Sequence, residues 1–197
     1  AFDQVKTMTD KIREMVLEIL NYARSRQMTY AAVPVADIVA HVMKSVKPAA
    51  SKNNVMCDVF MPDEPGIMEI DSMWMESALV NFLENAVDAC AYDHEKPVHR
   101  VSLSVTVEPD EFISIRIHDN GIGMDQETRE KMFTLFFTSK GSRGTGLGLF
   151  IAHRVIQQHG GTVHVTSALN QGTELTISLP RKPPGSVGEN GVSPLAP

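Results

Sequence analysis

Three glycines at alternate positions, Gly144, Gly146 and Gly148, form the part of the sequence best suited to bind phosphate. Two cations precede them, Lys140 and Arg143, and a segment with apolar residues at helical spacing follows. The first N–H groups of a helix have no partner within it, and the positive end of the helix dipole lies beside them, so phosphate binds well there. The spacing matches neither the dinucleotide fingerprint nor the P-loop, so we interpret this loop together with the other polar motifs.

A second polar group lies earlier in the chain, within a segment, 72–92, whose apolar spacing predicts a long helix. Its members, Asn81, Glu84, Asn85 and Asp88, recur at steps of three and four and therefore share one helix face. Such a face can simply contact solvent. The functional interpretation is an edge that holds a metal ion and phosphate, because Mg²⁺ takes oxygen ligands and one amide oxygen plus nucleotide phosphates would suffice.

A carboxylate and two glycines, Asp119, Gly121 and Gly123, follow an expected strand in the pattern Asp-x-Gly-x-Gly. On its own the pattern is typical of a turn. In the functional interpretation, Asp119 accepts a hydrogen bond from an amine such as the exocyclic N–H₂ of adenine, and the glycines let the ring lie against the backbone. The loop 133–143 that follows contains three phenylalanines, which either pack on the domain or belong to a mobile lid over a nucleotide.

The elements that position these motifs alternate between helices and strands. We take Asp37 as the N-cap of a helix that ends before Pro48, and 31–34 as a break between elements. The expected helices are 3–26, 38–46, 72–92, 125–132 and 146–159, and the expected strands are 55–61, 67–70, 101–107, 112–117, 162–166 and 173–179. This order predicts an α+β sandwich of one mixed sheet with helices on one face, with the helix 3–26 as an appendage.

The bulk composition bounds the class of protein. With 197 residues, of which 43% are hydrophobic and 21% charged, the chain suits one globular domain with an extra element at one end. A net charge of −6 argues against nucleic-acid binding, since no broad basic face is available. No apolar run approaches the ~20 residues of a membrane span, no signal peptide is visible, and Cys57 and Cys90 lack metal-ligand spacing. We expect a cytoplasmic region, although a longer parent protein could still be membrane-anchored.

Together the motifs resemble a known family. Their order is a helix with Asn81-x-x-x-Asn85, then Asp119-x-Gly-x-Gly at a strand end, then the phenylalanine loop, then Gly144-x-Gly-x-Gly running into a helix. This order resembles the catalytic ATP-binding domain of bacterial sensor histidine kinases, within the superfamily that includes DNA gyrase and the mismatch-repair ATPase. The resemblance covers 33–180 and implies a Bergerat-type two-layer fold over 31–181. It also implies that 1–30 is the second helix of a dimerisation hairpin, and we expect 182–197 to be a disordered tail.

The resemblance also implies a role for each motif. ATP would lie between the long helix and the lid, with Asn85 coordinating Mg²⁺ and Asp119 holding the adenine amine. Lys140, Arg143 and the amides of the glycine loop would hold the phosphates. The full set of expected ATP-binding residues is Asn81, Asn85, Asp88, Ala89, Asp119, Gly121, Gly123, Met124, Thr138, Lys140, Arg143, Gly144, Thr145, Gly146, Leu147, Gly148, Leu149 and Thr173.

One position distinguishes a kinase from an ATPase. Hydrolytic members of the superfamily carry a glutamate where this chain has Asn81, and an amide does not take a proton from water at neutral pH. We therefore expect a histidine kinase, whose reaction needs positioning and charge neutralisation, with Asn81 and Glu84 as candidate catalytic residues. The alternatives are a superfamily ATPase in which ATP drives dimer closure, and a degenerate binding module. Asp88 departs from the family, because many histidine kinases carry a lysine there, and it shifts the neutralisation of phosphate to Lys140, Arg143 and Mg²⁺.

The expected partners follow from the same resemblance. None of the seven histidines lies on the helix 3–26, so the phosphoacceptor would lie on a segment that this chain does not include. The phosphoryl group would then pass to the receiver domain of a response regulator. The apolar stripe of the helix 3–26 predicts a homodimer through that helix in the full-length protein, and no nucleic-acid partner is expected.

Overall fold

The computed structural model describes residues 9, 13, 28–108, 111–140 and 144–183. Apart from residues 9 and 13, the expected helix 3–26, to which the dimerisation role was assigned, lies outside the described residues, and so does Arg143. The same holds for 184–197, which is most of the expected tail. The division of the chain into 1–30, 31–181 and 182–197 therefore stays a prediction.

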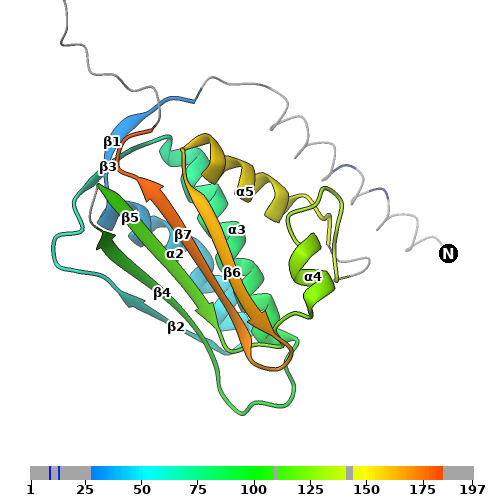
Figure 1. Cartoon of the computed structure of the whole chain (residues 1–197). Helices are drawn as coiled ribbons and strands as arrows, with labels where there is room; N and C mark the ends of the chain where they lie inside the picture. Colours follow the sequence, from blue (N-terminus) through cyan, green and yellow to red (C-terminus); the bar gives the residue numbers. More distant parts are fainter. Residues whose placement is uncertain (1–8, 10–12, 14–27, 109–110, 141–143, 184–197) are drawn as a thin grey trace, which may run out of the picture.

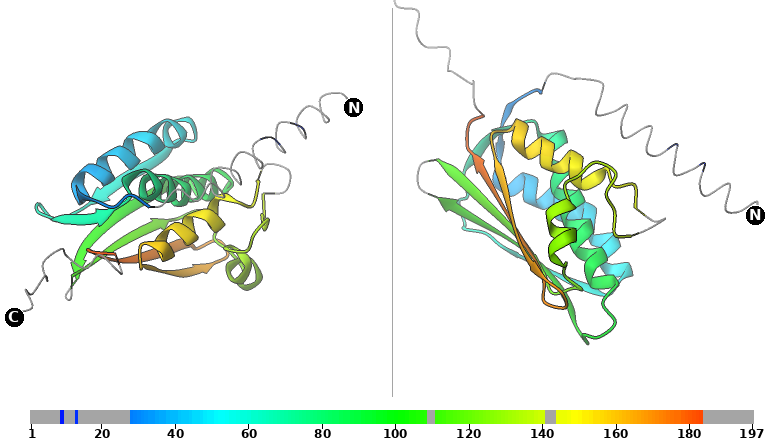
Figure 2. Two further views of the ribbon diagram at one scale, coloured as in Figure 1. Left: turned by 90° about the horizontal axis from the view of Figure 1, so that it is seen from above. Right: turned by 45° about the vertical axis from the view of Figure 1, so that its right-hand side comes forward.

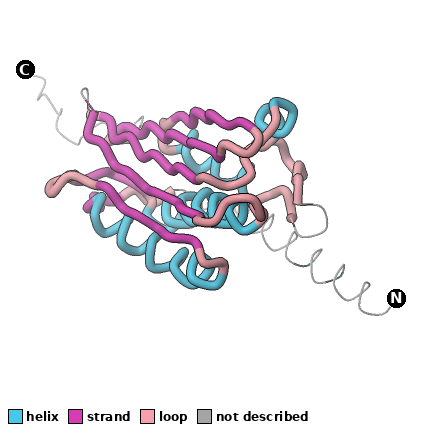
Figure 3. The backbone as a smooth tube through the Cα atoms, turned by 90° about the horizontal axis from the view of Figure 1, so that it is seen from below, coloured by secondary structure: helices cyan, strands magenta, loops and turns pink. Residues whose placement is uncertain are grey.

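A five-stranded sheet carries the domain (Figure 1). Its strands stand in the order β2-β4-β5-β7-β6, with β2 parallel to β4 and every other neighbouring pair antiparallel. Three helices, α2, α3 and α5, lie on one side of this sheet (Figure 2), and the tube view separates the two layers (Figure 3). The bounds are β2 Val55–Phe60, β4 His99–Glu108, β5 Phe112–Asp119, β6 Thr162–Ala168 and β7 Gly172–Pro180, with α2 Val35–Lys52, α3 Ser72–Ala91 and α5 Gly148–Gln158. The predicted α+β sandwich is confirmed.

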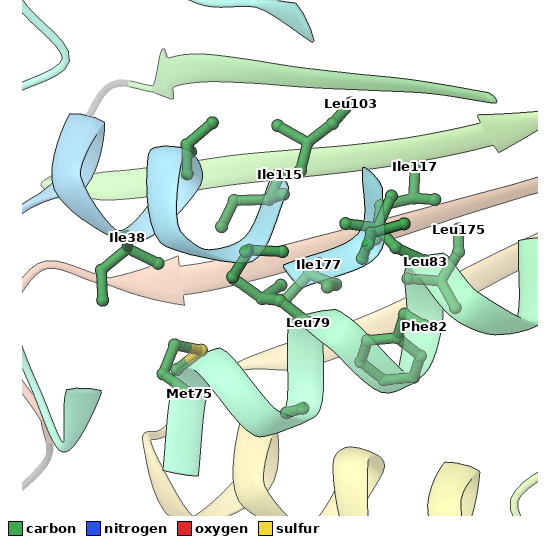
Figure 4. Packing of buried hydrophobic residues seen from close by; sticks show 14 of the residues in the cluster. Ile38, Met75, Leu79, Phe82, Leu83, Leu103, Ile115, Ile117, Leu175 and Ile177 are labelled. Atoms are coloured by element: carbon green, nitrogen blue, oxygen red, sulfur yellow. The ribbon is translucent and has the colours of Figure 1, made fainter. Parts of the chain in front are cut away.

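The core lies between the sheet and the central helix α3, which packs against both α2 and α5. Strands β4 and β5 alternate between buried aliphatic residues on the inner face and hydroxyl or charged residues on the outer one. Leu79, Phe82 and Leu83 of α3 are buried against Ile115 and Ile177 of the sheet (Figure 4). Since side chains alternate across a strand, one face of the sheet is apolar, and it has to be covered by the apolar stripe of a helix.

A second, two-stranded sheet was missed by the prediction of one mixed sheet. Residues 31–34, expected to be a break, form β1 Ala31–Pro34, which pairs antiparallel with β3 Ile67–Ile70. The strand β3 itself was predicted correctly. Its partner is too short and too weakly patterned to predict locally, because the pairing with a distant segment, rather than strand propensity, fixes β1.

Helix α2 is longer at both ends than the predicted 38–46, and Asp37 is not its N-cap. Pro34 occupies the N-cap, and Asp37 lies in the first turn, where its charge favours the positive end of the helix dipole. Pro48 lies inside the helix rather than beyond it. The lost backbone hydrogen bond is offset because Val46 and Ala50, two positions before and after the proline, are buried in the core.

The short helix α4 Gln126–Lys131 was predicted within one residue at each end. Its N-cap, Asp125, accepts a hydrogen bond from the backbone N–H of Thr128 at 2.8 Å. No helix of the described residues is long and apolar enough to cross a membrane.

A buried histidine joins the start of α3 to the end of α5. The N-cap of α3, Asp71, donates its backbone N–H to Nε2 of His159 at 3.1 Å. On the other side of the ring, Nδ1 lies 2.8 Å from the carbonyl of Val155. An amide can only donate and a carbonyl can only accept, so His159 is neutral with its proton on Nδ1. Burial, with 1% of His159 exposed, lowers its pKa from the ordinary value of 6.5.

The chain enters the domain at the same joint. The backbone N–H of Thr29 donates to Oδ2 of Asp71 at 2.9 Å, and the hydroxyl of Tyr30 donates to the carbonyl of Gln158 at 3.1 Å. The Tyr30 ring also lies edge-on to His159, with 5.3 Å between the ring centroids. Residues 29–30 are therefore fastened to both helices at once.

The depressed pKa of His159 predicts an acid-sensitive joint. The unfolded chain takes up this proton at a higher pH than the folded chain, so the stabilisation is complete above about pH 6.5 and is lost as the pH falls towards the folded pKa. We expect the free energy of unfolding, measured in urea at about pH 7.5 and about pH 5.5, to fall more in the native protein than in His159→Gln. Equal losses in the two proteins would contradict this assignment.

Candidate functional site

A cavity of about 640 Å³ opens between the C-terminal half of α3, the end of β5 and the loop that leads into α5. The polar face of α3 lines one wall, so the face opposite the core points at this cavity rather than only at solvent. The expected residues that line it are Asn81, Asn85, Asp88, Ala89, Asp119, Gly123, Met124, Thr138, Lys140, Gly144, Thr145, Gly146, Gly148, Leu149 and Thr173, and Glu84 lines it as well. Four motifs that are far apart in the sequence therefore share one cavity.

Asp119 is a buried charged residue that lines the cavity at the end of β5. The residue is 3% exposed, and its Oδ1 accepts the backbone N–H of Gly121 at 2.9 Å. The backbone N–H of Thr173, which stands opposite Asp119 on β7, also donates to it. Burial raises the pKa of Asp119 to about 6, against the smaller opposing effect of these donors. The carboxylate therefore changes its charge close to neutral pH.

The turn after β5 is pressed against α3. A Cβ on Gly121 would lie 2.4 Å from the carbonyl carbon of Ala89, and the N–H of Ile122 donates to the Ala89 oxygen at 3.1 Å. Gly121 therefore acts through close packing and does not itself line the cavity. Gly123 has a positive φ of 65°, and a Cβ there would lie 2.0 Å from the carbonyl oxygen of Ala168.

Two residues that sequence reasoning missed hold this turn in place. Lys96 donates from Nζ to the carbonyl of Gly121 at 3.2 Å and forms an ion pair with Asp93. Asp93 in turn accepts the backbone N–H of Glu95 at 2.8 Å. Lys96 follows a histidine in a loop, which is a pattern without diagnostic value, and only the fold shows that the loop reaches the glycine turn.

The amide side chains of α3 are each fixed on one side. Asn81 donates from Nδ2 to the carbonyl of Ser77 at 3.0 Å. On its other side, a Cβ added to Gly148 would lie 2.5 Å from the Oδ1 of Asn81, so the two residues are in close contact. Asn85 donates from Nδ2 to the carbonyl of Asn81 at 2.7 Å. Its Oδ1 is thereby directed at the cavity, where it can accept a hydrogen bond or coordinate a cation.

Lys140 reaches across the cavity to this helix face. Its Nζ lies 2.7 Å from Oδ1 of Asn85 and 2.5 Å from Oδ2 of Asp88. The ammonium thus takes the position where the sequence predicted a metal ion. Beside it, burial and the charge of Asp88 raise the pKa of Glu84, while Lys140 lowers it.

The loop that leads into α5 is shaped by close contacts. The N–H of Phe136 donates to the carbonyl of Gly146 at 3.0 Å, and a Cβ on Gly146, where φ is +70°, would lie 2.4 Å from the Phe136 carbonyl carbon. A Cβ on Gly144 would lie 2.1 Å from the hydroxyl of Thr138. Leu147, the N-cap of α5, is buried in the structure and does not line the cavity.

The three phenylalanines separate into different roles. Phe133 stacks on His153 with 4.3 Å between the ring centroids, and Phe137 lines the cavity. Phe136 is 56% exposed. Phe133 thus packs on the domain and Phe137 faces the cavity, and the mobile lid stays a prediction. The apolar lining that the prediction did not name comes from Phe82, Ala86, Ile117, Ile122, Met132, Phe137 and Leu175.

A metal ion in this cavity would need a ligand's oxygens as well as the protein's. Among the described residues, no group of three or more His, Cys, Asp or Glu side chains could hold a metal ion. Asn85 and Asp88 supply one amide and one carboxylate oxygen to a single cation, the ammonium of Lys140. Such hard oxygen donors suit Mg²⁺, which keeps waters and phosphate oxygens in its remaining positions.

The fold and the cavity define a class of protein, a two-layer sandwich with a cavity between its central helix and a glycine-rich loop. Residues 70–183 match the family described as histidine kinase-, DNA gyrase B-, and HSP90-like ATPase, and the chain belongs to this family. The matched segment contains all four motifs.

Relatives within this family are sensor kinases. The signal transduction histidine-protein kinase AtoS of Escherichia coli K12 is 29% identical over 90% of this chain and 28% of its own length. The solved structure of the mycobacterial sensor histidine kinase MprB has a TM-score of 0.67 at 26% identity, over 79% of this chain and 99% of that one. Histidine kinase ThkA, solved in complex with the response regulator TrrA, has a TM-score of 0.74 over 93% of this chain and 51% of that one. Its 20% identity shows the fold alone. This chain spans less than a third of AtoS.

The tight turn after β5 predicts a stability difference between two glycines. Gly123→Ala would place a methyl group against a backbone oxygen, whereas Gly66→Ala, at a similar φ of +83°, would meet the Arg181 guanidinium, which can shift only by giving up its hydrogen bonds to the Pro65 and Ile67 carbonyls. We expect a loss of about 2 kcal/mol for Gly66→Ala, from the strained φ and the displaced guanidinium, and at least about 1 kcal/mol more for Gly123→Ala, whose backbone neighbour cannot move aside. Urea unfolding of both variants measures the difference, and equal losses would show that the turn can relax.

Proposed function

We propose that this chain is the ATP-binding catalytic region of a sensor histidine kinase. In this proposal it transfers the γ-phosphoryl group of ATP to a histidine outside the described residues, for relay to an aspartate of a response regulator. The observation that carries it is the pairing of a buried carboxylate, Asp119, with the cavity-facing amide oxygen of Asn85 in one cavity of about 640 Å³. The carboxylate of Asp119 suits the amine of a base, and the amide oxygen of Asn85 suits a cation beside phosphates.

At the base end, this chain's residues select a ring with an amine donor. Ile117, Met124 and Leu175 supply apolar walls, while the ionised Asp119 retains lone pairs beyond those used by its two backbone donors. The ionised carboxylate is the stronger acceptor for adenine N6, because the hydrogen bond is then charge-assisted and both oxygens accept. Its raised pKa therefore ties base recognition to pH.

At the phosphate end, Lys140, the N-terminus of α5 and the glycine-loop amides would neutralise and orient the phosphates, together with Arg143. Asn85 would ligate Mg²⁺, and Asp88 lies beside it. When bound, that ion supplies the charge neutralisation that phosphoryl transfer needs. The protein's part of the reaction is to hold the γ-phosphorus in line with the incoming imidazole.

Asn81 supports a kinase over the alternative ATPase that closes a dimer. The side chain at this position is an amide with its N–H₂ bonded to the Ser77 carbonyl and its oxygen against Gly148. Neither atom can take a proton from water. Glu84 has a raised pKa but stands one turn further along α3.

The partners belong to the same proposal. ThkA has been solved with its response regulator TrrA, which supports a receiver domain as the partner of this chain as well. The proposal also includes a homodimer through the helix 3–26, predicted from its apolar stripe, and a cytoplasmic location for this region. No nucleic-acid partner is proposed, since the net charge is −6.

Isothermal titration with Mg-ADP tests the site. We expect binding by the native chain and a loss of at least about tenfold in affinity for Asp119→Ala, because the amine loses a charged acceptor. Asp125→Ala, which removes a carboxylate that caps α4 outside the cavity, is the control and should bind Mg-ADP normally. Absence of binding by the native chain would end the nucleotide proposal.

Adenosine isolates the pH dependence of the base end, because it has no phosphate that titrates. The pKa of Asp119 is raised to about 6, so its ionised form is lost as the pH falls through that value. We expect adenosine affinity to fall below about pH 6 in the native chain and to change little with pH in Asp119→Asn, whose amide oxygen accepts at any pH. A matching pH profile in both proteins would refute the role of Asp119.

Phosphoryl transfer distinguishes the kinase from the ATPase. A hairpin that carries the acceptor histidine, mixed with this chain and labelled ATP, should yield an acid-labile phosphoprotein. Histidine→Ala in the hairpin is the control. Steady release of phosphate by this chain, without phosphorylation of the hairpin, would favour the ATPase instead.

A further inference from the structure

Lys140 and Asp88 form a contact between two motifs that the sequence treats separately. Lys140 follows the phenylalanines, and Asp88 lies on α3 three residues after Asn85. The ammonium of Lys140 binds Oδ1 of Asn85 at 2.7 Å and Oδ2 of Asp88 at 2.5 Å. Its side chain is 25% exposed, and that of Asp88 is 44% exposed. The ammonium of Lys140, which belongs to the loop, is therefore held by two side chains of α3.

The two oxygens that hold Lys140 are the ones a divalent ion would need. A Mg²⁺ ion ligates oxygen at about 2.0–2.1 Å. With the ammonium of Lys140 on the same amide oxygen, the two cations would lie only about 4 Å apart and repel each other strongly. Lys140 has to leave Asn85 whenever that oxygen ligates a metal. The nearest new partners for its charge are the phosphates that arrive with the metal.

We propose that Lys140 is an internal cation that occupies the metal-ligating pair Asn85–Asp88 until a divalent ion carried by a nucleotide replaces it. Asp88 is then the positioning residue that holds Lys140 on α3 in the nucleotide-free protein, and it becomes a second oxygen beside the metal when Lys140 moves to the phosphates. This inference rests on the nucleotide-binding function proposed above.

The proposal accounts for an acidic residue beside a phosphate site. An aspartate there repels phosphate when it is unpaired. With Lys140 bound, the pair is neutral, and the empty site does not hold an uncompensated negative charge. When Lys140 shifts to the phosphates, the metal restores the balance on Asp88. In this proposal Asp88 is therefore paired with a cation in each state of the site.

The ratio of the ADP dissociation constant without Mg²⁺, in EDTA, to that with Mg²⁺ tests the exchange. In Asp88→Asn, Lys140 is released for phosphate and the metal loses an oxygen, so we expect the ratio to fall by about two- to fivefold. In Lys140→Met, metal-free binding weakens while the metal site stays open, so the ratio should rise. Glu76→Gln removes a carboxylate from the same helix on the side that faces His41 rather than the cavity, and its ratio should stay close to that of the native chain.

A double-mutant cycle gives the sign of the coupling. Because Asp88 and phosphate compete for Lys140, Lys140→Met should weaken metal-free ADP binding more in the Asp88→Asn background than in the native one. The opposite sign would mean that Lys140 bridges Asp88 and phosphate together, and would overturn the exchange.

Hydrogen exchange of the backbone amides of 133–140 provides a test that involves no nucleotide. We expect faster exchange in nucleotide-free Asp88→Asn than in the native chain, and native-like exchange in Glu76→Gln, because only the first variant frees Lys140. Unchanged exchange in Asp88→Asn alongside normal Mg-ADP binding would refute this inference and leave the proposed function standing. Failure of the native chain to bind Mg-ADP would instead refute the proposed function, whatever the exchange rates.

Discussion

The site depends on the orientation of one helix, α3, about its own axis. Its apolar stripe is buried against the sheet between α2 and α5, and Leu79 and Leu83 are fully buried there. Burying each leucine contributes about 1.5–3 kcal/mol, so a rotation that exposed this stripe would cost several times the energy of any polar contact on the opposite face. The polar face has no comparable interaction of its own. Core packing therefore directs Asn85 and Asp88 towards the cavity, and no ligand contact is needed to orient them.

The second constraint is the contact between the turn after β5 and the backbone of α3. Gly121 is close enough to Ala89 to exclude any side chain, and Ile122 bonds to the Ala89 carbonyl. This contact sets the separation between a buried carboxylate and the helix that carries the amides. The burial that raises the pKa of Asp119 is thus a product of the same packing, since a looser turn would admit water and lower that pKa.

The sequence predicted those parts of the fold and site that depend on periodicity. The polar face of α3, the strands β4 and β5 and the turn at Asp119 follow from spacing along one segment. The partner of β3 and the passage of α2 through Pro48 depend on contacts with distant residues, which spacing does not encode. The ion pair of Lys140 with Asp88 joins residues 52 positions apart, and Lys96 reaches Gly121 across 25. Neither contact could be predicted without the folded positions of the loops that carry Lys140 and Lys96.

The joint at His159 has a geometric consequence for the cavity. It binds the first residues of α3 to the last of α5, whereas the cavity lies between the other ends of the same two helices. The two helices are therefore antiparallel arms with a common pivot, and the entering residues Thr29 and Tyr30 are bonded at that pivot. A few degrees of tilt about it changes the gap between Gly148 and Asn85 far more than it stretches the bond to Asp71. Packing along α3 and α5, down to the contact of Asn81 with Gly148, therefore sets the width of the cavity at that end.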